Sequence, residues 1–216
     1  MQPRALIFDC DGTLADSMPL HWRAWNTVCK RNGIELAEAR FYKLGGVPSQ
    51  KILAMLKEEQ GLDFDPADIS RQKEEAYLPL MSEVKLIEPV AAIARAHVGK
   101  LPMAIATGGR AKYIRPLLER LGVADWFQAL VTSDDVKNHK PAPDTFLKAA
   151  ALLDVPPEDC RAFEDTDLGM EAIRAAHMDA VDVRTIDGVL PENTSVYSTS
   201  ICVAFSGICC RTQTYR

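Results

Sequence analysis

The sequence has no excess of basic residues, because 25 Lys and Arg stand against 30 Asp and Glu and the net charge is −5. Nucleic acids and anionic membranes are bound through positive charge, so this balance argues against both as partners. No apolar run approaches the roughly 20 residues that span a bilayer, and the short run at 5–8 cannot be the core of a signal peptide. We therefore expect a cytoplasmic protein in which local positive groups hold any anionic substrate.

Zinc-binding cysteine pairs are also missing, since none of the six cysteines stands in a CxxC spacing. Cys10, Cys29 and Cys160 are isolated, and we interpret them as small buried hydrophobic residues. The other three cysteines lie in the tail, residues 185–216, for which we expect poor order. A packed extra segment and a site for a partner or a palmitoyl group are the alternatives. Nothing in the sequence indicates an oligomer, and we expect a monomer.

Short apolar runs alternate with helical patterns along the chain, which is typical of a parallel α/β sheet. The runs are continuously apolar, as expected for strands that are covered on both faces. We predict strands at 4–9, 101–107, 127–133, 160–164 and 180–183. We predict helices between them at 110–121, 143–153 and 167–176.

One region, residues 17–82, breaks this alternation because its patterns predict helices and no strand. Ser17 is a candidate N-cap for the first of these helices. Further helices are predicted at 49–59 and, with many charged residues, at 66–81. The sequence therefore predicts a core made of residues 1–15 and 84–184, with a helical module, residues 16–83, inserted after the first strand.

The first predicted strand ends in Asp9-Cys10-Asp11-Gly12. In open parallel sheets ligands bind outside the carboxyl ends of the strands, so Asp9 and Asp11 leave the strand toward one site. Gly12 allows a sharp turn that exposes backbone N–H groups. An ordinary turn is the alternative, because Asp and Gly are common turn residues.

Two further strands are followed by groups that suit a phosphate. The second ends at Thr107-Gly108-Gly109 just before a helix, and a hydroxyl with free amides there suits a phosphate oxygen. The third is followed by Lys140, whose charge can balance that of a phosphate in a loop that prolines stiffen. A simple N-cap and a solvated lysine are the alternatives.

The fourth strand ends in an acidic pair, Glu164 and Asp165. Adjacent carboxylates at a strand end suit a hard cation such as magnesium, while helix N-capping by Asp165 is the alternative. Four successive strands thus deliver two acids, a hydroxyl, an amine and two more acids to one edge of the sheet. Independent turns rarely produce that order, so we interpret the set as one site.

The order and spacing of these motifs resemble those of the haloacid dehalogenase (HAD) superfamily. Its signatures stand here as Asp9-Cys10-Asp11-Gly12-Thr13, Thr107, Lys140-Pro141 and Glu164-Asp165. The helical insert is similar to the small cap of the beta-phosphoglucomutase-like branch. Segments 23–25, 140–146 and 178–183 resemble bacterial phosphatases of that branch that act on fructose 1-phosphate and 6-phosphogluconate. The resemblance covers residues 4–184 and implies a Rossmann-like parallel sheet core with an inserted helical cap.

The resemblance implies a magnesium-dependent phosphatase that hydrolyses small sugar phosphates, fructose 1-phosphate or similar hexose phosphates, through an aspartyl-phosphate. It assigns Asp9 as the nucleophile and Asp11 as the general acid and base. Asp11 has to be protonated in the first step, so we expect its pKa to be raised. The implied phosphoryl-binding residues are Gly12, Thr107, Gly108, Gly109 and Lys140. The implied ligands of Mg²⁺ are Asp9, Glu164, Asp165 and the backbone carbonyl of Asp11.

Other functions are weighed against this one. A dehalogenase releases a halide and needs no proton donor at position 11. A sugar-phosphate mutase of the same branch carries a Lys and an Arg for the distal phosphate where this chain has Gly45 and Ser49, which makes it the less favoured alternative. A non-catalytic phosphosugar-binding protein is the third possibility. His21 is expected to contact the substrate or Asp11, or to lie on the surface, and His177 is expected to adopt a left-handed conformation.

Overall fold

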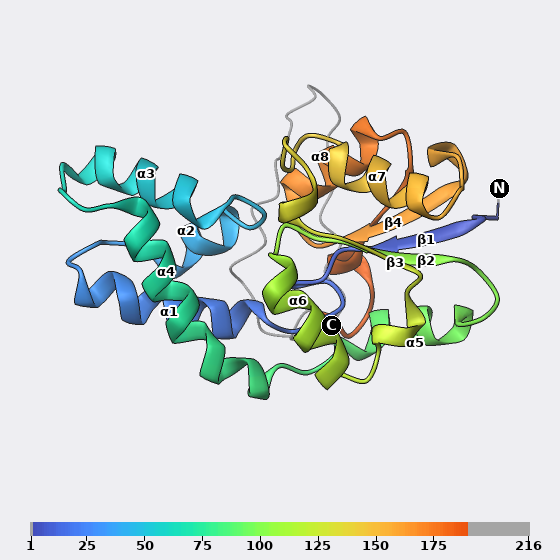
Figure 1. Ribbon diagram of the computed structural model, residues 1–216, viewed down its shortest axis with the longest axis horizontal. Coiled ribbons are helices and arrows are strands. Elements are labelled where there is room, and N and C mark those ends of the chain that lie inside the picture. The colour runs from blue at the N-terminus through green and yellow to red at the C-terminus, as the bar shows by residue number, and fades with distance from the viewer. Residues whose placement is uncertain (1, 190–216) are drawn as a thin grey trace, which may run out of the picture.

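A computed structural model describes residues 2–189 of the chain as a sheet flanked by helices, with a further group of helices beside it (Figure 1). All strands are parallel and form one sheet in the order β3-β2-β1-β4-β5. The strands are β1 (Ala5–Phe8), β2 (Met103–Ala106), β3 (Ala129–Val131), β4 (Cys160–Glu164) and β5 (Asp179–Asp182). The predicted α/β fold is confirmed, and β1 lies at the centre of the sheet.

Helices cover both faces of the sheet. Successive side chains of a strand point to opposite faces, so each strand contributes to two buried clusters. Leu6 and Phe8 of β1 belong to a buried cluster with α5 and α6, whereas Ala5 and Ile7 belong to one with α7 and α8. These helices are α5 (Glu88–His97), α6 (Ala111–Arg120), α7 (Asp144–Leu152) and α8 (Asp167–Ala175). Burial on both faces explains why β1 and β2 are continuously apolar.

The helices that follow β1 form a third buried cluster of their own, which includes Trp25, Val28, Leu53 and Ile69. These helices are α1 (Met18–Arg31), α2 (Glu38–Lys43), α3 (Ser49–Gln60) and α4 (Pro66–Tyr77). We call residues 18–77 the helical layer. Figure 1 shows it beside the core, next to the loops that follow the strands.

Several local predictions are corrected. The helix predicted at 66–81 ends as an α-helix at Tyr77 and continues as the 3-10 helix Leu78–Glu83. Pro79 has no backbone N–H for the α-helical hydrogen bond, which explains the change. Ser17 precedes α1 as predicted, but its side chain makes no cap hydrogen bond. The strands β1, β2 and β3 are shorter at both ends than predicted.

The C-terminal part of the described chain extends the core. His177 follows α8 with a φ of 58°, which confirms the predicted left-handed conformation. Ile186 and Val189, which the sequence places in the tail, pack against the same buried cluster as α5 and α6. The remainder of the predicted tail, residues 190–216, lies outside the described residues. None of the helices in residues 2–189 is long and apolar enough to cross a membrane.

Candidate active site

A cavity of about 510 Å³ lies between the helical layer and the loops that follow the strands, within the size range of sites for small molecules. The core contributes Asp9, Asp11, Thr107, Gly108, Gly109, Lys140 and Glu164 to its lining, and the helical layer contributes His21, Gly45, Ser49, Lys73 and Tyr77. Most of the residues singled out in the sequence therefore face one space.

Lys140 joins two buried carboxylates at the sheet side of this cavity. Its Nζ lies 2.7 Å from Oδ1 of Asp9 and 2.6 Å from Oε2 of Glu164. Burial acts to lower the pKa of Lys140, but the two carboxylates raise it overall, so the ammonium stays charged. Burial and the charge of Glu164 raise the pKa of Asp9 to about 7, despite the opposing effect of Lys140. One ammonium therefore does not offset the combined effect of burial and of the Glu164 charge on Asp9.

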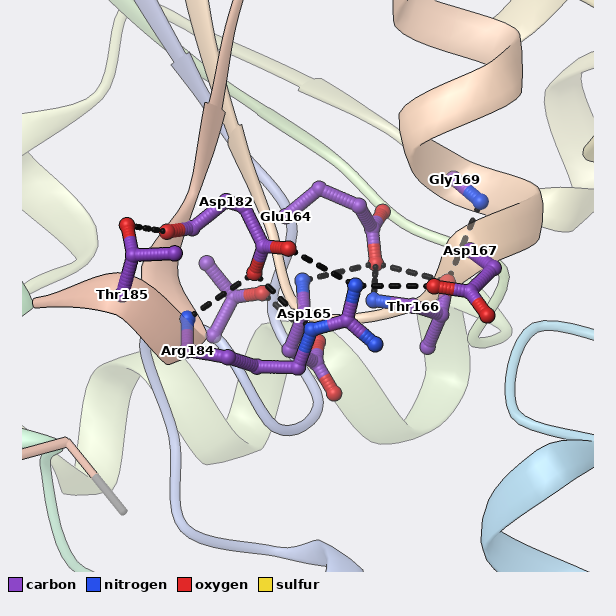
Figure 2. A network of polar contacts seen from close by, with 9 residues as sticks. Glu164, Asp165, Thr166, Asp167, Gly169, Asp182, Arg184 and Thr185 are labelled. Atoms are coloured by element: carbon purple, nitrogen blue, oxygen red, sulfur yellow. Dashed lines mark hydrogen bonds and ion pairs between the residues drawn. The ribbon is translucent and has the colours of Figure 1, made fainter. Parts of the chain in front are cut away.

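Glu164 is held through both of its carboxylate oxygens. Oε1 accepts hydrogen bonds from the backbone N–H groups of Asp165 and Thr166 and from the Thr166 hydroxyl, at 3.1, 3.0 and 2.9 Å (Figure 2). Oε2 accepts from Lys140. Gly169 of α8 passes so close that a Cβ there would lie 2.0 Å from the Glu164 carboxylate. Glu164 is thus fixed in one position, where it orients Lys140.

Asp165 completes a group of three carboxylates with Asp9 and Glu164, whose oxygens lie within 4.8 Å of one another. Burial and the charges of the other two carboxylates raise the pKa of Asp165 well above its usual range. The Thr13 hydroxyl donates to Oδ1 of Asp165 at 2.7 Å. Gly12 is required beside it, since a Cβ there would lie 2.3 Å from Oδ2. Buried carboxylate oxygens with uncompensated negative charge fit a hard cation such as Mg²⁺.

Two of the backbone amides predicted to bind a phosphate are engaged in the structure. The Gly109 N–H donates to Oγ1 of Thr107 at 3.0 Å, and the Gly12 N–H donates to the carbonyl of Ala15 at 2.8 Å. Their roles in phosphate binding stay predictions. The Gly108 amide and the hydroxyl of Thr107, which line the cavity, remain candidate donors to a phosphate oxygen.

Asp11 has its partners in the helical layer and in the segment that leads to it. Ser17 donates from its hydroxyl to Oδ1 of Asp11 at 2.6 Å, which explains why it does not cap α1. Nε2 of His21 lies 3.4 Å from the same oxygen. His21 is thus placed against Asp11, one of the positions expected from the sequence.

The pKa of Asp11 is lowered, which corrects the expectation that it rises. Burial is the largest influence and acts upward, but hydrogen bonds from His21 and Ser17 and the charge of Lys73 outweigh it. A phosphate dianion that enters the cavity would act in the opposite direction, because a nearby negative charge raises the pKa of a carboxyl group.

Lys73 of α4 is a cavity residue that the sequence reasoning missed. Its Nζ lies 3.1 Å from Nδ1 of His21 and 5.5 Å from the ring centroid of Tyr77. Burial lowers the pKa of Lys73 from 10.5 to about 8. Tyr77 stacks on the His21 ring with 3.8 Å between centroids. The available signal was the four-residue spacing of Ile69, Lys73 and Tyr77, which places them on one helix face.

The His21 ring connects Lys73 to Asp11. Burial and the charge of Lys73 lower the pKa of His21 below its usual 6.5, so the ring is neutral at pH 7. In a neutral ring with these neighbours, Nδ1 accepts a hydrogen bond from the Lys73 ammonium and the Nε2–H group faces Asp11. The helical layer therefore reaches the carboxylate of Asp11 through one imidazole.

A parallel sheet with paired acids, a hydroxyl and a lysine at the carboxyl ends of its strands defines an α/β enzyme with its site at that edge. The chain belongs to the haloacid dehalogenase-like hydrolase family, whose sequence model matches residues 6–183. It is a hydrolase of the Rossmann-like type that the sequence motifs predict.

Similar proteins include phosphatases and a mutase. The chain is 40% identical over 181 residues to the fructose-1-phosphate phosphatase YqaB of Escherichia coli (strain K12), covering 84% of this chain and 96% of that protein. It is 29% identical over 187 residues to the beta-phosphoglucomutase of Bacillus subtilis (strain 168), covering 83% of each. CbbY from Rhodobacter sphaeroides, solved in complex with phosphate, matches with a TM-score of 0.73 at 28% identity, over 83% of this chain and 85% of that chain.

Proposed function

We propose that this protein is a magnesium-dependent phosphatase that hydrolyses small sugar phosphates, with fructose 1-phosphate or a similar hexose phosphate as its substrate. The observation that carries the proposal is the position of Lys140 between Asp9 and Glu164 in a cavity of about 510 Å³. The similarity to a fructose-1-phosphate phosphatase supports the substrate class. We further expect a cytoplasmic monomer that acts without nucleic acid or membrane.

The core residues carry the phosphoryl transfer. The Asp9 carboxylate attacks the phosphorus in line with the ester oxygen, and the product is an aspartyl-phosphate. Lys140 and Thr107 hold oxygens of the phosphoryl group. Water then attacks the phosphorus, which releases inorganic phosphate and restores Asp9.

Asp9 and Asp165 are the side chains that we propose to bind Mg²⁺. The bound cation would supply positive charge against the phosphate and against the surplus of carboxylates. We assign Glu164 to holding Lys140, since both of its oxygens already accept hydrogen bonds. The contribution of the backbone carbonyl of Asp11 stays a prediction.

Asp11 moves the protons in both steps. It donates a proton to the sugar oxygen as the ester bond breaks, and it later accepts one from the attacking water. Lys73 and His21 favour the ionised form that the second step needs, because they act to lower its pKa. The substrate dianion favours the protonated form that the first step needs.

The part of the cavity lining that the helical layer contributes favours water as the phosphate acceptor. A mutase has to bind a second phosphate group, and this requires positive charge. Among the described residues, Lys73 is the one Lys or Arg that the helical layer adds to the lining, and it already faces His21. Gly45 and Ser49 add no charge. Because a beta-phosphoglucomutase is among the similar proteins, sugar-phosphate isomerisation remains the second candidate function.

Phosphate release from a panel of sugar phosphates, measured with Mg²⁺ and with a chelator, tests the proposal. The panel contains fructose 1-phosphate, 6-phosphogluconate and glucose 1-phosphate. Conversion of glucose 1-phosphate into glucose 6-phosphate is followed in parallel. We expect release that stops with the chelator and in the isosteric variant Asp9→Asn. Isomerisation faster than release would instead identify a mutase, and binding without turnover would identify a phosphosugar-binding protein.

A further inference from the structure

Gly45 lies where the helical layer meets the core. It belongs to the loop between α2 and α3, and a Cβ at this position would lie 2.9 Å from Cγ2 of Thr166. A Cβ at Gly46 would lie 3.6 Å from Oγ1 of the same threonine, and a Cβ at Gly108 would lie 3.8 Å from the Gly46 carbonyl oxygen. The two glycines of this loop therefore approach two core loops, one before α6 and one before α8.

The conformation of Gly45 does not itself require glycine. Gly46 has a φ of 83°, in the left-handed region, whereas Gly45 is not among the positive-φ residues. An alanine at position 45 would therefore be allowed by the backbone and excluded by its surroundings. Its nearest neighbours would be the Thr166 methyl group at 2.9 Å and the Tyr42 carbonyl oxygen at 3.2 Å. What position 45 needs is the absence of a side chain.

Thr166 connects this contact to the phosphoryl site. Its hydroxyl donates to Oε1 of Glu164 at 2.9 Å and accepts from the Gly169 N–H at 3.1 Å, so its orientation is fixed (Figure 2). Glu164 holds Lys140, which in turn holds Asp9. The loop of the helical layer thus rests on Thr166, which holds Glu164, and Glu164 in turn orients the lysine.

We propose that Gly45 is a positioning residue, and that its contact with the Thr166 methyl group sets how closely the helical layer sits on the core during catalysis. The same layer carries His21, whose ring faces Asp11. If the loop is pushed outward, His21 moves with the layer and the cavity widens. Misplacement of catalytic groups by about 1 Å costs up to roughly 100-fold in rate, so a single added methyl group has a measurable effect.

A double-mutant cycle tests this contact with Gly45→Ala, Thr166→Ser and the double variant. Thr166→Ser keeps the hydroxyl and deletes only the methyl group that the alanine would meet. Relative to wild type, we expect Gly45→Ala to lower kcat/KM for fructose 1-phosphate by roughly 10- to 100-fold, with kcat reduced as well as KM raised. On the Thr166→Ser background we expect Gly45→Ala to lower kcat/KM by less than about threefold, because the methyl group that the alanine would meet is absent.

Hydrogen–deuterium exchange of residues 42–50 gives a second readout that needs no turnover. Exchange should be faster in Gly45→Ala than in wild type, and the double variant should return toward the rate of Thr166→Ser. Gly45→Ala that fails to fold while the double variant folds would also support the contact. An equal effect on both backgrounds would overturn the proposal and assign the clash to the Tyr42 carbonyl, and so would unchanged exchange and kinetics.

The kinetic double-mutant cycle rests on the proposed phosphatase function, whereas the hydrogen–deuterium exchange comparison does not. A wild-type protein that hydrolyses no sugar phosphate would refute the proposed function, and the exchange comparison would still decide whether Gly45 seats on Thr166.

Discussion

Replacing Lys73 with methionine should stabilise the protein at pH 7 while reducing its activity. Lys73 is only 7% exposed, and its ammonium lies among the rings of His21, Trp25 and Tyr77. Burial is the main reason why its pKa falls from 10.5 to about 8. At 1.36 kcal/mol per pH unit, this fall corresponds to a cost of roughly 3 kcal/mol for keeping the charge in the folded state.

The sign of the pH dependence follows from where the proton is bound. Below pH 8 both states carry the proton on Lys73, and the folded state bears the full cost. Between pH 8 and pH 10.5 the unfolded state binds more protons than the folded state, so stability rises with pH and the cost disappears. The other titratable groups that face Lys73 are His21 on α1, Asp11 after β1, and Glu74 and Tyr77 on α4.

Methionine has nearly the same length and no charge, but it leaves Nδ1 of His21 without its donor, which costs about 1 kcal/mol. We therefore expect Lys73→Met to be more stable than wild type by about 1–2 kcal/mol at pH 7. For a chain of this length, that raises Tm by about 2–8 °C. Phosphate release should fall at least about tenfold, because Asp11 loses the influence of Lys73 that favours its basic form.

Urea unfolding at pH 7 and pH 10 measures this effect, with Lys51→Met as the matched control. Lys51 is an exposed lysine of α3, and its replacement should change stability by less than about 0.5 kcal/mol. The increase in the free energy of unfolding from Lys73→Met should be smaller at pH 10 than at pH 7. A Lys73→Met protein that is less stable than wild type at pH 7, or a gain in stability that is equal at both pH values, would show that the buried charge of Lys73 does not destabilise the fold.

Three further predictions concern the core. Lys140→Met leaves two buried carboxylates without their ammonium, so we expect a loss of about 3–5 kcal/mol in urea unfolding without Mg²⁺; a loss below 1 kcal/mol would show that the carboxylates do not depend on it. Thr13→Val removes the hydrogen bond to Asp165, and the Mg²⁺ concentration for half-maximal activity should rise about 10- to 100-fold, while an unchanged titration would show that this hydrogen bond does not orient Asp165 for Mg²⁺. His177→Gly relieves a left-handed conformation and should add about 1 kcal/mol of stability with kcat unchanged; calorimetry that shows a lower Tm would contradict this.

The edge of the sheet could be predicted because parallel strands bring their carboxyl ends together. Asp9, Thr107 and Lys140 follow strands that are recognisable as continuous apolar runs, and Glu164 ends the strand β4. The order of those runs along the chain, with helices between them, was enough to place the four residues on one side of the sheet.

The hydrogen bonds within the site could not be predicted in this way. Whether the amides of Gly12 and Gly109 face a ligand or a neighbouring oxygen depends on turn geometry, which the sequence leaves open. Lys73 was missed because its burial comes from the packing of α4 on α1, whereas α4 reads as a strongly charged helix in the sequence. The same holds for Gly45, whose role depends on the approach of Thr166 from a distant loop.

Direct detection of the phosphorylated enzyme tests the central claim that Asp9 accepts the phosphoryl group. Fructose 1-phosphate is mixed with excess enzyme and Mg²⁺, the reaction is quenched in acid within milliseconds, and the protein is reduced with borohydride before peptide mass spectrometry. We expect Asp9 to be converted to homoserine, transiently and only with substrate, and we expect no such product from Asp9→Asn. Phosphate release without any modification of Asp9, or with the modification at another carboxylate, would contradict that claim.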